Sequence, residues 1–162
     1  MKSRWTEQVT AILYKEALTE FRGRHGLFTA GMFGLLTVIA LVFASFSEKV
    51  SQGTVAAMLT SALVFSAVVT VPRTLISEDE QGTFVLLMLL AEPGAAFLGK
   101  CIGNCAQMLA GGGLLTVGYF AMTATVVSQP LFFVSALALF SLALAVGVSF
   151  CTALVLGSSN RW

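Results

Sequence analysis

The longest uncharged stretch of the chain, residues 101–160, limits what it can fold into. These sixty residues contain no lysine, arginine, aspartate, glutamate or histidine. Soluble domains carry about 25% charged residues, whereas this chain of 162 residues is 10% charged and 57% hydrophobic. A long uncharged stretch is typical of a helical hairpin embedded in lipid. The sequence therefore predicts an all-α integral membrane protein with one domain over residues 1–162.

Four apolar stretches are long enough to be transmembrane helices. They cover residues 27–46, 54–71, 101–127 and 131–156. About twenty helical residues cross the roughly 30 Å hydrocarbon core of a bilayer. Pro72 and Arg73 mark the end of the second stretch. The sequence therefore predicts four membrane spans.

Residues 1–26 form a fifth segment, which we expect to be an interfacial helix. Trp5 lies on its apolar side and suits the level of the lipid headgroups. Lys15, Arg22 and Arg24 suit an anionic cytoplasmic leaflet. With four spans, all lysines and arginines except Lys49 lie on the side that holds both termini. Because such residues are enriched in cytoplasmic loops, we expect a multi-pass protein of the bacterial plasma (inner) membrane with both termini cytoplasmic.

The loop at residues 73–100 is the part most informative about function. It holds three consecutive acidic residues, 78–80, and each would cost about 2.5–3.5 kcal/mol at the bilayer centre. Gly82 follows as a break, and residues 83–90 are apolar but too few to span the membrane. Pro93 ends this apolar segment. A short apolar helix on the cytoplasmic face must be covered by the membrane surface, by the protein's own bundle or by a soluble partner.

Several other functions lack the residues that they need. The basic residues form no patch for nucleic acid, and the spans hold no charge of the kind that marks an ion or proton pathway. Residues 94–100 fit the phosphate-loop pattern GxxxxGK, but Cys101 replaces the hydroxyl residue and no strand precedes it. Cys101 and Cys105 are interpreted as small packing residues, and His25 as polar boundary sequence rather than a haem ligand. We therefore expect no enzymatic site, no bound cofactor and no metal.

The loop resembles that of type-2 ABC transporter permeases. In this superfamily an E-x-E-x-G-T segment precedes a short apolar helix, a proline and a glycine–lysine pair. Here these are residues 78–83, residues 86–90, Pro93 and Gly99-Lys100. The resemblance implies a coupling loop that docks on a separate ATPase subunit, with residues 1–26 as the elbow. The docking residues it implies are Glu78, Glu80, Gly82, Leu86, Leu87, Leu90 and Pro93.

One branch of the superfamily is more similar than the others. Residues 15–24 (KEALTEFRGR) and 43–46 (FASF) are similar to the cytochrome c maturation protein B family, the haem-exporter permease subunits. The resemblance implies haem as cargo, ATP used by the partner, other cytochrome c maturation subunits nearby, and a permease dimer. Members usually have six spans, so the chain is either a shortened permease or lacks two helices. A generic type-2 permease with another cargo and a non-transporting membrane scaffold are the alternatives.

Overall fold

Every regular element in the described part of the chain is an α-helix. The computed structural model describes residues 2–23, 25–47, 51–80, 82–123 and 129–159. The helices are α1 (Lys2–Gly23), α2 (His25–Ser47), α3 (Gln52–Glu80), α4 (Thr83–Leu90), α5 (Pro93–Thr123) and α6 (Pro130–Ser159). The predicted all-α class is therefore confirmed.

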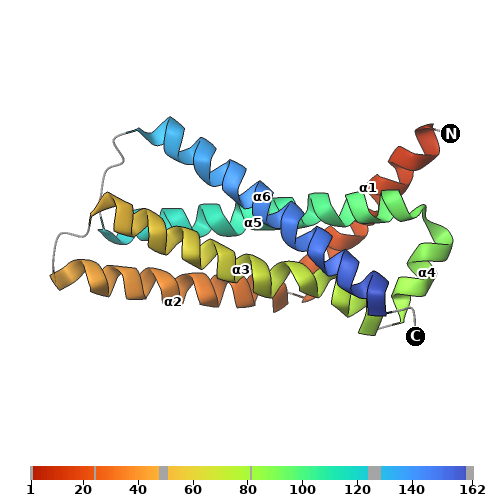
Figure 1. The fold of residues 1–162 in the computed structure, drawn as a ribbon, viewed down its shortest axis with the longest axis horizontal. Helices are drawn as coiled ribbons and strands as arrows, with labels where there is room; N and C mark the ends of the chain where they lie inside the picture. Colours follow the sequence, from red (N-terminus) through yellow and green to blue (C-terminus); the bar gives the residue numbers. More distant parts are fainter. Residues whose placement is uncertain (1, 24, 48–50, 81, 124–128, 160–162) are drawn as a thin grey trace.

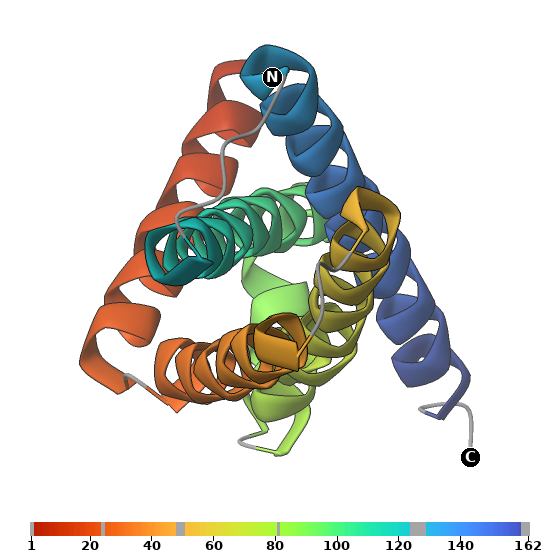
Figure 2. The same ribbon diagram turned by 90° about the vertical axis from the view of Figure 1, so that its left-hand side faces the viewer.

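The long helices form one elongated bundle. α2, α3 and α5 run along its length, and α6 crosses α3 and α5 obliquely (Figure 1). α1 packs against the first half of α5, so that it forms one side of the bundle when viewed end-on (Figure 2). α4, the start of α1 and the end of α6 lie toward one end of the bundle. The ends of α2 and α5 and the starts of α3 and α6 lie at the other.

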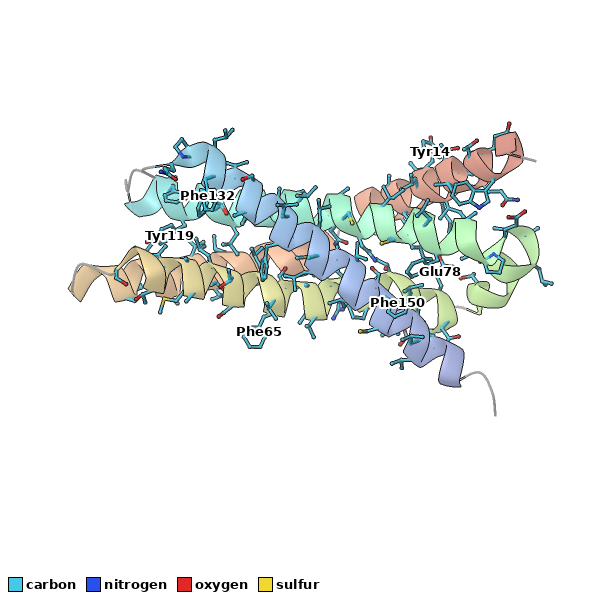
Figure 3. All side chains as sticks on the ribbon, turned by 45° about the horizontal axis from the view of Figure 1, so that its top comes forward. Tyr14, Phe65, Glu78, Tyr119, Phe132 and Phe150 are labelled. Atoms are coloured by element: carbon cyan, nitrogen blue, oxygen red, sulfur yellow. The ribbon has the colours of Figure 1, made fainter. Side chains whose placement is uncertain are left out.

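Two clusters of buried side chains hold the bundle together. One joins α2, α3 and α5 through Val38, Leu59, Ala62, Leu115 and Tyr119. The other joins α3, α5 and α6 through Ala67, Val71, Met108 and Ala145. Small residues allow close approach, as expected for helices that pack in lipid. Outside these clusters many apolar side chains face outward, for example Phe65 on α3 and Phe150 on α6 (Figure 3).

Two described helices are long and apolar enough to cross a membrane. They are Gly53–Glu80 and Pro130–Gly157, which match the second and fourth predicted spans. α2 contributes a shorter apolar stretch, Gly34–Ala44. α5 is 31 residues long but is not one of these two helices. The count of four spans therefore stays a prediction.

The segment predicted as the cytoplasmic loop, residues 73–100, is largely helical in its described part. α3 does not end before Pro72 but continues through it to Glu80. Proline is tolerated inside such helices where neighbouring groups satisfy the freed backbone. α5 begins at Pro93, eight residues before the predicted third span, because proline is favourable in the first helical turn. Between α3 and α5 the described residues, 82–92, form α4 and the short turn that follows it.

Candidate docking helix and ion cluster

α4 is a short apolar helix that stands at the end of the bundle (Figure 1). Gly82 precedes it with a left-handed backbone (φ 67°), a conformation that glycine adopts without a steric penalty. Ala91 follows it with an extended backbone. Leu89 and Leu90 are 78% and 72% exposed. The chain therefore presents two adjacent leucines at the end of the bundle that carries the acidic residues 78–80.

Glu78 lies in the last turn of α3 and is buried, near the start of α4 (Figure 3). Its Oε1 accepts a hydrogen bond from Lys15 Nζ at 2.5 Å. Its Oε2 accepts one from Thr83 Oγ1, the first residue of α4, at 2.6 Å. Burial acts to raise the pKa of Glu78, but the hydrogen bonds from Lys15 and Thr83 and the charges of Lys100 and Lys15 outweigh it and lower the pKa. Glu78 is therefore held as a carboxylate.

Lys100 lies on α5 and is only 2% exposed. Its Nζ donates to Glu16 Oε1 at 2.6 Å and to the Thr74 carbonyl oxygen at 2.8 Å, and it lies 3.4 Å from Glu78 Oε1. These three acceptors match the three protons of an ammonium group. Lys15, Glu16, Glu78 and Lys100 are called the ion cluster below. Its two positive and two negative charges balance.

α1 is more than a surface helix, because one side of it is packed on α5. Val9 and Ile12 are buried. A Cβ on Gly99 would lie 2.8 Å from Ile12 Cγ2, so the two helices meet where α5 has no side chain. The exposed Trp5 and Lys15 lie on the same helix. The interfacial position predicted for α1 stays a prediction.

The predicted docking residues divide into exposed and buried ones. Glu80, Gly82, Leu90 and Pro93 are exposed and Leu87 is half-buried. Glu78 differs, because its carboxylate is buried and paired within the chain. Leu86 lies in α4, Arg22 in α1 and His25 at the start of α2, but their side chains, like the whole of Arg24, are outside the described residues.

The ion cluster was not predicted from the sequence. Glu78 was assigned to a partner, and Lys100 was considered only as part of two motifs. One signal was available: a lysine that directly precedes sixty uncharged residues must be paired if it is buried. The partner Glu16 is 84 positions away, so the pairing depends on the packing of α1 against α5.

The residues that fit the phosphate-loop pattern are helical. Pro93–Thr123 forms α5, which includes the whole pattern. A phosphate loop needs a strand followed by an open loop of backbone N–H groups. Residues 94–100 therefore do not form such a loop.

Fold and site together define an all-helical chain with two helices able to cross a membrane and an exposed apolar helix beside a buried ion cluster. Comparison with known proteins adds no relative: no family model, no curated protein and no solved structure matches the chain.

Proposed function

We propose that this chain is the membrane permease subunit of an ABC transporter and that α4 docks on a separate ATPase subunit. The observation that carries the proposal is the exposure of Leu89 and Leu90 on a helix too short to span a bilayer. Adjacent exposed leucines are typical of a surface that a partner covers. The exposed Asp79 and Glu80 at the end of α3 lie nearby and suit basic groups on that partner.

The membrane setting is supported by the outward-facing apolar surface of the bundle. In the apolar 18-residue stretch of each of these helices, only 33% is buried in Gly53–Glu80 and 11% in Pro130–Gly157. A core helix of a soluble protein would be mostly buried. α2 and α5 complete four spans in the proposal. α4 and the start of α1 lie at one end, which the distribution of basic residues makes cytoplasmic.

The proposed mechanism assigns no chemistry to the chain itself. ATP hydrolysis takes place in the partner, whose closure displaces α4. α5 follows α4 after a short turn that begins at Ala91, so a displacement of α4 reaches a membrane helix directly. The bundle then changes between two packings of similar energy, as in other transporters with rigid helical units.

Docking is tested by purifying the tagged chain from membranes of its native host. We expect an ATP-hydrolysing subunit to copurify with the wild type and with the Leu89→Met/Leu90→Met variant, which keeps an apolar surface. The Leu89→Asp/Leu90→Asp variant is expected to lose it, because a charge opposes burial in an apolar contact. Equal copurification with both double variants, or no ATP-binding subunit with the wild type, would remove the basis for docking through α4.

The proposed cargo is haem, delivered for assembly of c-type cytochromes. This part rests on the resemblance of residues 15–24 and 43–46 to haem-exporter permeases. Apart from the ion cluster, the buried side chains of the described residues are apolar or uncharged, which suits an apolar or amphiphilic cargo. The test is a haem stain of membranes from cells that lack the gene: covalently bound haem should vanish, b-type haem should persist, and the 162-residue chain should restore the stain. Unchanged c-type bands would leave a permease for another cargo or a scaffold.

A further inference from the structure

The ion cluster joins three helices at one point, and Thr83 attaches a fourth. Lys15 and Glu16 come from α1, Glu78 from α3 and Lys100 from α5. Thr83 connects α4 to the same point through Glu78 Oε2. A buried lysine without charged partners strongly destabilises a folded protein. The position of Lys100 is therefore tied to the positions of both carboxylates.

α4 is held at both of its ends. At its start, Thr83 Oγ1 donates to Glu78 Oε2 at 2.6 Å. Just after its end, the backbone N–H of Glu92 donates to Gln8 Oε1 of α1 at 3.3 Å. Between these two points Leu89 and Leu90 are exposed. α4 is thus fixed to the bundle by polar contacts near both of its ends, while these two leucines remain uncovered.

We infer that the ion cluster is a mechanical latch that makes α4, α1, the end of α3 and the first turns of α5 move as one unit. A displacement of α4 acts on Glu78 through Thr83, and Glu78 shares Lys100 with Glu16. If α4 moved alone, Glu78 would lose Thr83 or Lys100 would lose an acceptor, which is costly for buried charges. Moving α1, the end of α3 and the first turns of α5 together with α4 preserves every contact. Glu78 and Lys100 are therefore positioning residues for the docking helix.

The inference rests on the proposed function only for the origin of the displacement, so it is tested on the purified chain without any partner. The full-length protein, with its three cysteines replaced by alanine, is reconstituted in lipid nanodiscs. Spin labels are attached to cysteines that replace the exposed Tyr14 on α1 and Leu89 on α4. Pulsed electron–electron double resonance then measures the distance between the two labels.

We expect one narrow distance distribution for the parent protein. Glu78→Gln, which keeps the shape but removes the charge, is expected to lose the narrow peak. Asp79→Asn is the matched control, because it removes a neighbouring exposed charge of the same helix, and the narrow peak should remain. Circular dichroism verifies that each variant keeps its helix content. A well-folded Glu78→Gln protein that retains the parent distribution would overturn the latch, whatever the outcome of the copurification.

Discussion

Substitution of Lys100 by methionine tests the energetics of the ion cluster. Methionine keeps a long unbranched side chain but removes the ammonium group, which leaves Glu16 and Glu78 without their shared cation. Breaking a buried ion pair from one side costs about 3–5 kcal/mol. Glu78 keeps its contacts with Lys15 and Thr83, so the lower end applies. We expect a loss of about 3 kcal/mol, or roughly a hundredfold in the unfolding equilibrium.

The matched control is Lys15→Met, which removes the other cation of the same cluster. The side chain of Lys15 is 48% exposed, and Glu78 still faces Lys100 when Lys15 is removed. Exposed ion pairs contribute about 0.2–1 kcal/mol. Unfolding is followed by circular dichroism in mixed detergent micelles with increasing dodecyl sulfate. Equal losses for the two variants would refute the conclusion that burial makes Lys100 the central cation.

Three further outcomes follow from individual positions. Gly99→Ala should destabilise the protein by about 1–3 kcal/mol in the same assay, because the new Cβ meets Ile12, whereas Gly94→Ala, which has open space, should be tolerated. Gly82→Ala should cost about 1–2 kcal/mol, since its φ of 67° disfavours side chains; a melting temperature equal to the wild type would contradict this. Folding lowers the pKa of Glu78, so its stabilising effect is present above its ordinary value of 4.5 and is lost as the pH falls through the lowered value. Unfolding curves of the wild type and Glu78→Gln between pH 7 and pH 3 should therefore converge at acidic pH, and a constant difference would oppose this assignment.

The long helices were predictable because their signals are local. The predicted span at residues 27–46 coincides closely with α2, and that at residues 131–156 lies within α6. Each is an apolar run bounded by polar residues, so its existence depends on hydropathy alone. The predicted end of the second span at residue 71 stays a prediction, because the helix itself does not end there. In the structure the helix continues through Pro72 to Glu80.

The candidate site was only partly predictable. The exposure of Leu90 and Glu80 agrees with their position in a loop beyond an apolar run. The burial of Glu78 could not be derived from the sequence, because its carboxylate pairs with Lys15, 63 positions away. Such pairing arises only after α1 packs on α5. Of the three consecutive acidic residues, Glu78 is buried and paired, whereas Asp79 and Glu80 are exposed. The local sequence does not show which of the three is buried.

Cross-linking from α4 in native membranes tests the central claim most directly. A photoreactive phenylalanine analogue is placed at Leu90, and the control carries it at Leu131, which is also exposed but lies at the start of α6 at the other end of the bundle. Docking on an ATPase predicts that the Leu90 probe forms an adduct with an ATP-binding subunit and that the Leu131 probe does not. Adducts with lipid alone at Leu90, or the same protein adducts at both positions, would contradict the account.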